Sequence, residues 1–268
     1  MEKNQQTMAY QPPKVPDVKT VTFETIFDAL KAGIRDFLRA PLFGIFFGGI
    51  FTLGGLFILA CLTYFQMPWM IIPVAIGFPL IGPFVAVGLY EVSRRLSAGE
   101  PLVWSEILLV IFRQRERQLS WMAFVVLFVF WIWIYQVRLL LALFLGFKSV
   151  STIPRFIEVV TTTQEGMMFV GVGTISGAIL SFIMFSATVV AIPLLLDREL
   201  DFITAMIVSF KTVFQNLVPM ICWGIIVVAL AVAAMIPAFL GLIIVMPILG
   251  HATWHLYVAA IGSEKEAT

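Results

Sequence analysis

The chain has few charged residues and few of the residue types that carry enzyme chemistry. Charged residues make up 12% of its 268 positions, about half the share found in an average soluble domain. It has two histidines and two cysteines, and no Gly-rich phosphate loop, Gly-x-Ser-x-Gly or Cys-x-x-Cys motif occurs. These absences exclude the common constellations of soluble enzymes.

Strong net charge is also missing. The formal net charge is +1, and no basic stripe interleaved with aromatic residues appears along the chain. A protein that binds nucleic acid usually carries such a stripe, because it must neutralise phosphates. We therefore expect no nucleic-acid partner.

Long hydrophobic runs are what the chain has instead. Hydrophobic residues make up 60% of it, and about 20 apolar residues in helical form span a bilayer. Six such runs lie at 43–64, 71–90, 121–144, 167–195, 217–235 and 238–261. Because the backbone in lipid must satisfy its own hydrogen bonds, we predict an all-α, polytopic protein with six transmembrane helices and the lipid bilayer as a partner.

Positive charge lies mainly on one side of these predicted spans. Most of the 17 Lys and Arg residues lie before the first span, between the second and third, and between the fourth and fifth. By the positive-inside rule, both termini then face the cytoplasm. We expect a disordered tail at 1–19, which is rich in proline, a membrane domain at 20–262 and a short tail at 263–268.

An amphipathic stretch precedes each pair of spans, at 22–39, 104–118 and 201–216. Apolar residues recur there at helical spacing, and basic residues such as Lys31 and Arg35 lie on another side. Thr22 and Asp201 are suited to be N-caps. We predict three hairpins, each preceded by a cytoplasmic amphipathic helix that lies on anionic lipid or packs on the bundle. The pseudo-repeats run over 22–95, 101–198 and 201–261.

Two Gly-x-x-x-Gly patterns occur in the predicted spans, at Gly44/Gly48 and Gly173/Gly177. Small residues at this spacing let two helices approach closely in lipid. The pattern fits packing within the bundle or dimerisation, and we expect packing within the bundle.

The two histidines, His251 and His255, lie in the last predicted span. Four residues apart on a helix, they share one face, and titratable groups inside a membrane span suggest a functional site. Cys222 and Met220 begin the preceding span from the same side. The four residues together form a candidate metal site, and imidazole and sulfur ligands suit copper or zinc.

Other roles for this histidine pair stay open. Two histidines on the same side of one helix cannot bind the iron of a single haem from opposite sides. A haem site would therefore need a His/Met ligand pair or a ligand from another chain. The pair can instead donate hydrogen bonds to a neighbouring helix as a polar contact, or relay protons or bind substrate on a pathway. We expect a polar contact first and a metal site second.

The chain resembles a family of uncharacterised six-span bacterial integral membrane proteins, a domain of unknown function. The resemblance rests on the strings at 29–36, 41–44 and 197–198, and most specifically on Gly-His-Ala-Thr-Trp-His at 250–255. It implies location in the bacterial cytoplasmic (inner) membrane and supports six spans. It implies no activity and no catalytic residue.

Two classes of function follow from these observations. The first is a non-enzymatic scaffold or accessory subunit of a membrane assembly, in one version a respiratory one, with other membrane-protein subunits as partners. The second is a small-solute or proton-coupled transporter or permease. A scaffold predicts a dry, Gly-packed bundle, whereas a transporter predicts a polar cavity near the middle of the membrane. Few polar residues are available in the spans to line such a cavity.

Overall fold

The computed structural model describes residues 15–64, 71–115, 118–146 and 153–262, and every regular element among them is helical. This confirms the all-α prediction. The elements in chain order are α1 (Phe23–Arg39), α2 (Pro41–Thr63), α3 (Ile71–Ala98), α4 (Trp104–Arg115), α5 (Leu119–Leu140) with the π-helical turn η2 (Leu141–Leu145), α6 (Ile153–Thr162), α7 (Gln164–Thr188), α8 (Ala191–Asp197), α9 (Phe202–Gln215), α10 (Leu217–Met235) and α11 (Leu242–Ile261).

Five helical segments of the described chain are long and apolar enough to cross a membrane. They are Pro41–Cys61, Leu119–Leu145, Gln164–Asp197, Leu217–Met235 and Leu242–Ile261. Helix α3, the second predicted span, has 28 residues but is not among these five. The protein is therefore a multi-pass membrane protein, and a sixth span stays a prediction.

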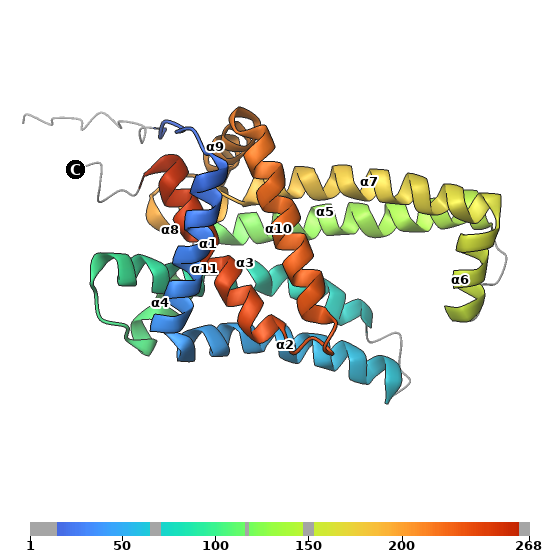
Figure 1. Ribbon diagram of the computed structural model, residues 1–268, viewed down its shortest axis with the longest axis horizontal. Coiled ribbons are helices and arrows are strands. Elements are labelled where there is room, and N and C mark those ends of the chain that lie inside the picture. Colours follow the sequence, from blue (N-terminus) through green and yellow to red (C-terminus); the bar gives the residue numbers. More distant parts are fainter. Residues whose placement is uncertain (1–14, 65–70, 116–117, 147–152, 263–268) are drawn as a thin grey trace, which may run out of the picture.

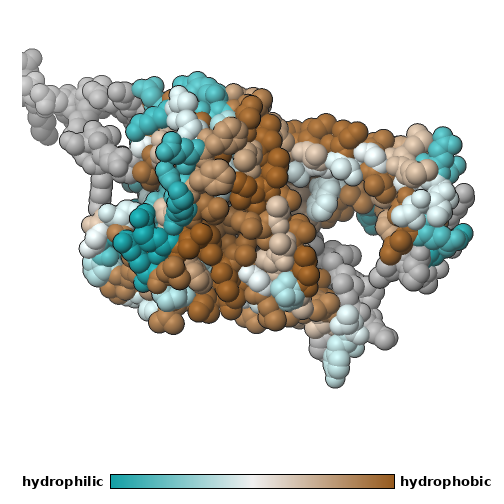
Figure 2. All heavy atoms as spheres, viewed as in Figure 1, coloured by the Kyte–Doolittle hydropathy of each residue, from teal (hydrophilic) through white to brown (hydrophobic). Residues whose placement is uncertain are grey.

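Helices α5 and α7 run side by side toward one end of the molecule, whereas α10 and α11 end nearer its middle (Figure 1). Helices α1, α4, α8 and α9 gather at one end, and α6 lies at the opposite end (Figure 1). Hydrophobic residues fill the middle of the same view, and hydrophilic residues gather at both ends (Figure 2). This distribution matches a bilayer that surrounds the middle of the bundle.

The amphipathic stretches form helices where predicted. Thr22 caps α1 because its side chain accepts a hydrogen bond from the Thr25 backbone N–H. The Thr25 side chain in turn accepts a hydrogen bond from the Thr22 backbone N–H. Asp201 caps α9 in the same way, accepting from the Thr204 N–H at 2.9 Å. Both predicted N-caps are confirmed, because each side-chain oxygen satisfies a backbone donor that the first helical turn leaves unpaired.

Two features of the chain path were not predicted. Helix α6, an amphipathic helix of 10 residues, occupies a stretch treated as a connection between two spans. The fourth predicted span, at 167–195, is broken at Val189 and Val190, between α7 and α8. Pro193 lies in the first turn of α8, where its missing N–H costs little.

The two Gly-x-x-x-Gly patterns behave differently. Gly44 lies against Phe37 and Pro247, and Gly48 lies against the backbone of Ile243, so α2 packs closely on α11. For this pattern, packing within the bundle is confirmed. In the second pattern, a Cβ at Gly173 would meet Leu140 at 3.8 Å and one at Gly177 would meet nothing within 4 Å, so this pattern forms only a loose contact within the bundle.

Candidate functional site

The seam between α1 and α11 brings together the most specific parts of the sequence. A Cβ at Gly33 would lie 2.6 Å from the Ile248 carbonyl oxygen and 2.7 Å from the Ala252 nitrogen, so the two backbones nearly touch. Ile26, Ala29 and Asp36 share this buried face of α1. The close approach places Asp36 against the C-terminal half of α11.

Asp36 accepts a hydrogen bond from His255. The distance from His255 Nε2 to Asp36 Oδ2 is 2.6 Å, and the two side chains are 20% and 4% exposed. Burial alone would raise the pKa of Asp36, but the hydrogen bond and electrostatic attraction of His255, with a hydrogen bond from Ser93, hold that pKa below its usual value. Asp36 is therefore an anion at neutral pH.

His251 contacts the neighbouring helix α3. Its Nδ1 lies 2.8 Å from Ser93 Oγ. Ser93 also contributes to the lowered pKa of Asp36, so this hydroxyl lies between His251 and the carboxylate. His251 Nε2 is buried and has no hydrogen-bond partner among the described residues.

The four side chains tie three helices together: α1 through Asp36, α3 through Ser93, and α11 through His251 and His255. The arrangement is the polar contact that the sequence favours for the histidines. Asp36 and Ser93 were not nominated as site residues. A signal for Asp36 exists, since its spacing from Ile26, Ala29 and Gly33 places it on the same helical face.

The metal site formed by His251, His255, Cys222 and Met220 stays a prediction. Met220 is fully buried on α10 and Cys222 is half-buried there. Across the described part of the chain, no three or more His, Cys, Asp or Glu side chains come together in a way that could hold a metal ion.

The lowered pKa of Asp36 gives a pH-dependent contribution to stability. A carboxyl whose native pKa is depressed stabilises the fold above the ordinary Asp pKa of about 4, and this stabilisation is lost as the pH falls toward the native value. The difference in free energy of unfolding between wild type and Asp36→Asn is expected to shrink as the pH falls below about 4. Denaturant titrations in detergent check this, and an unchanged difference at about pH 3 would refute the assignment.

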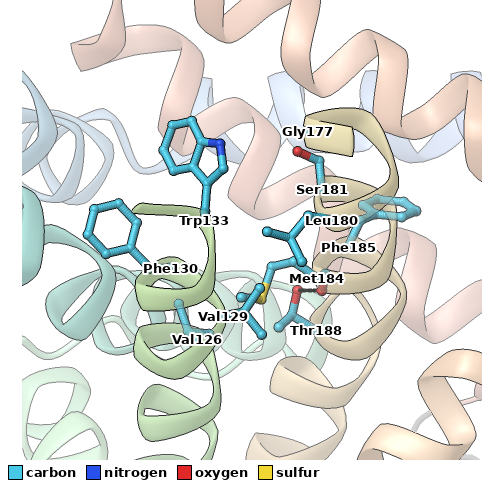
Figure 3. A pocket seen from close by; sticks show the side chains of 10 residues that line it. All are labelled: Val126, Val129, Phe130, Trp133, Gly177, Leu180, Ser181, Met184, Phe185 and Thr188. Carbon is cyan, nitrogen blue, oxygen red and sulfur yellow. Dashed lines mark hydrogen bonds between the residues drawn. The ribbon is translucent and has the colours of Figure 1, made fainter. Parts of the chain in front are cut away.

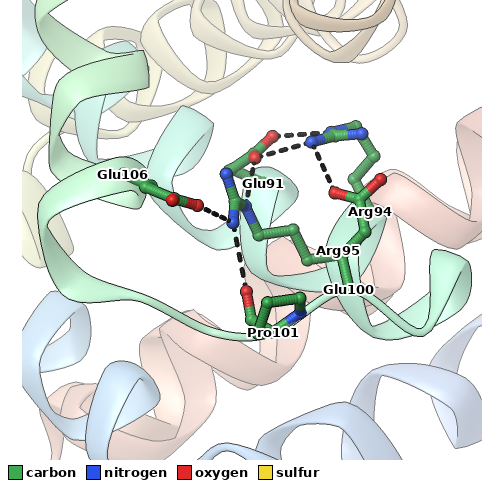
Figure 4. Close-up of polar contacts among 6 residues, drawn as sticks. All are labelled: Glu91, Arg94, Arg95, Glu100, Pro101 and Glu106. Atoms are coloured by element: carbon green, nitrogen blue, oxygen red, sulfur yellow. Dashed lines mark hydrogen bonds and ion pairs between the residues drawn. The ribbon is translucent and has the colours of Figure 1, made fainter.

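A second polar cluster lies where α3 leads into α4. Glu91, only 1% exposed, accepts from Arg94 Nε at 2.7 Å and from Arg95 Nε at 2.6 Å (Figure 4). Arg95 also donates to the Pro101 carbonyl oxygen at 3.1 Å and to Glu106. These bonds fix the connection between α3 and α4 with every one of these charges paired.

A third set of contacts ties down the end of α11. The Tyr257 hydroxyl donates to Asp197 at 2.7 Å, and Arg198 donates to the Gly262 carbonyl oxygen at 2.8 Å. The Lys19 N–H donates to the Ala260 carbonyl oxygen at 2.8 Å. Residues 197–198, which belong to the resemblance, thus meet α11 close to the histidines.

An apolar groove lies between α5 and α7. It encloses about 370 Å³ and is lined by ten residues. In the close-up, Trp133 and Phe130 come from α5, while Leu180, Met184 and Ser181 come from α7 (Figure 3). The hydroxyl of Thr188, another lining residue, donates to the Met184 carbonyl oxygen of its own helix at 2.8 Å. The groove therefore offers mainly apolar contacts.

Comparisons with known proteins agree with the membrane assignment. Residues 71–197, from α3 to α8, match a family model described as "Predicted integral membrane protein (DUF2189)". The match supports an uncharacterised membrane family, while six spans and the histidine string at 250–255, outside the matched region, stay predictions. No curated protein and no solved structure matches the chain.

Proposed function

We propose that this multi-pass protein is a non-enzymatic scaffold or accessory subunit that holds another membrane protein through its α5–α7 hairpin. The carrying observation is the low burial of α5: 6% of its most apolar window is buried within the chain, against 17% for α10, 33% for α2, 44% for α11 and 50% for the segment Gln164–Asp197 that contains α7. An exposed helix beside an open groove suits a partner helix, because helices in lipid associate through close packing.

The character of the groove favours a scaffold over a transporter. A path for polar solutes needs hydrogen-bonding side chains aimed into a wet cavity. The groove is lined mostly by Val, Leu, Phe and Met, and Thr188 bonds its own helix. The histidines, for their part, are engaged by Ser93 and Asp36 at one end of the bundle.

We further propose the full topology: six spans in three hairpins, with α3 as the sixth crossing and both termini cytoplasmic in the bacterial inner membrane. It is supported by the gathering of α1, α4, α8 and α9 at one end (Figure 1). It is supported also by the predicted pseudo-repeats.

This topology predicts opposite accessibility for two positions. In a variant without its two natural cysteines, a cysteine at Glu199, beside α8, should react with an impermeant maleimide only after the cells are permeabilised. A cysteine at Glu158 on α6 should react in intact cells, because an impermeant reagent cannot cross the bilayer. Labelling of both positions in intact cells would contradict cytoplasmic placement of α8.

The scaffold proposal predicts that filling the groove releases the partner. Gly177 lines the groove and its Cβ space is empty, so Gly177→Leu should fold normally yet lose at least about tenfold in affinity, or about 1.4 kcal/mol. Gly171→Leu is the matched control, since Gly171 also has open space but lies outside the groove. The measurement is the mass of the complex purified in nanodiscs from the native host.

Two outcomes of that experiment would count against the scaffold. A wild-type protein that purifies as a monomer would show that no partner is bound. Equal effects of both variants would place the contact elsewhere on α7. Solute flux through wild-type proteoliposomes would favour the transporter.

A further inference from the structure

A polar pocket lies beside His255 along the seam between α1 and α11. It has a volume of about 430 Å³, within the range of pockets that bind small ligands or peptide segments. Ala29 and Ala32 form part of its wall, and the adjacent seam is held rigidly by the contact of Gly33 with α11. The pocket is thus a hollow in a firmly packed part of the structure.

His255 is held in place within this pocket from behind. Its Nε2 bonds the buried carboxylate of Asp36, and its side chain is 20% exposed on the pocket side. A carboxylate behind a histidine fixes the tautomer and the ring orientation, which leaves Nδ1 as the second polar atom of the ring. The site therefore offers a pre-oriented polar group without a cost of ordering it.

Charge in the pocket is divided between its two ends. Arg35 lies at the His255 end, whereas Asp28 and Glu24 lie toward the start of α1. Asp28 and Arg35 are seven residues apart, about 10 Å along the helix axis. Lys31 pairs with Asp28 at 3.2 Å, but both side chains are exposed, at 78% and 61%, so this pair is weak and replaceable.

The pocket opens on the polar side of α1. The outward apolar stripe of Phe23, Phe27, Ile34 and Leu38, each more than 40% exposed, lies on a different side of the helix from Asp28 and Arg35. Lipid contacts that stripe if α1 lies in the interface. A ligand would therefore reach the pocket from the aqueous phase.

We propose that this pocket binds an extended peptide segment of a partner protein. Arg35 would hold a carboxylate, and His255 Nδ1 would accept a hydrogen bond from an N–H of the segment. Asp28 and Glu24 would face a basic side chain about three residues away, since extended chain covers about 3.3 Å per residue. The proposal rests on the scaffold function and adds an aqueous contact to the one within the membrane. The separated positive and negative charges of the pocket complement a segment that carries one acidic and one basic side chain.

Fluorescence polarisation with the full-length protein in nanodiscs tests this. The probe is a labelled, end-blocked Lys-Ala-Ala-Glu peptide, and the comparison peptides are Lys-Ala-Ala-Lys and Glu-Ala-Ala-Glu. Wild type should bind the mixed-charge probe saturably and more tightly than either comparison peptide. Arg35→Glu should weaken its binding at least about tenfold and improve binding of Lys-Ala-Ala-Lys.

Arg39→Glu is the matched control, because Arg39 is an exposed basic residue of the same helix outside the pocket. It should change the Kd by less than about twofold. Equal losses in both variants would show non-specific attraction and overturn the proposal, as would absence of saturable binding to wild type. Either failure leaves the Gly177→Leu result on the groove untouched, so the two proposals fail separately.

Discussion

Replacing His255 with alanine is expected to destabilise the protein by about 3 to 5 kcal/mol. The substitution leaves the Asp36 carboxylate, 4% exposed, in a buried position with Ser93 but without the His255 ring that pairs with it. A buried charge that has lost its partner pays its desolvation cost uncompensated. The measurement is the free energy of unfolding in detergent at neutral pH.

A double-mutant cycle with Asp36→Ala separates this reason from simple loss of packing. The double variant should lose less than the sum of the single losses, because it leaves no unpaired carboxylate. If the losses of the two single variants were strictly additive, the 2.6 Å contact between His255 and Asp36 would contribute no interaction energy. A further variant, His251→Ala/His255→Ala, tests the metal prediction. Copper, zinc or haem that is bound to the wild type and absent from this variant would support a metal site.

Gly48→Ala is expected to cost about 3 kcal/mol. Its new Cβ would collide with the carbonyl group and Cα of Ile243, and backbone cannot move aside as a flexible side chain can. Helices α2 and α11 would have to separate, which forfeits packing along their whole contact. The apparent Tm should fall by roughly 6 to 12 °C.

Gly49→Ala provides the control at the next position of the same helix. A Cβ there meets nothing within 4 Å, and alanine is the better helix former. Its Tm should be unchanged or slightly higher. If both substitutions lowered the Tm equally, the cause would be a general loss at the glycines rather than the contact with Ile243.

The sequence predicts the helices well and their contacts poorly. Long apolar runs and the N-caps Thr22 and Asp201 are local signals, and both N-caps and five of the six runs were confirmed. Helix α6 was missed because it lies between two predicted spans, and the break before α8 was missed because a two-residue break hardly changes an average over a span.

The candidate site could be predicted only in part. The spacing of His251 and His255 shows that they share a helix face, but not which helix faces them. Ser93 and Asp36 come from 158 and 219 residues away along the chain. Likewise, the two Gly-x-x-x-Gly patterns look alike in sequence, and only the fold shows that Gly48 contacts a backbone and Gly177 contacts open space.

The most direct test of the scaffold is photo-crosslinking in native membranes from within the groove. A photoreactive residue at Ser181, which lines the groove, is compared with one at Ile179, which is 58% exposed and lies outside it. The scaffold predicts a discrete protein adduct from position 181 and lipid adducts from position 179. Lipid adducts alone from both positions would contradict it.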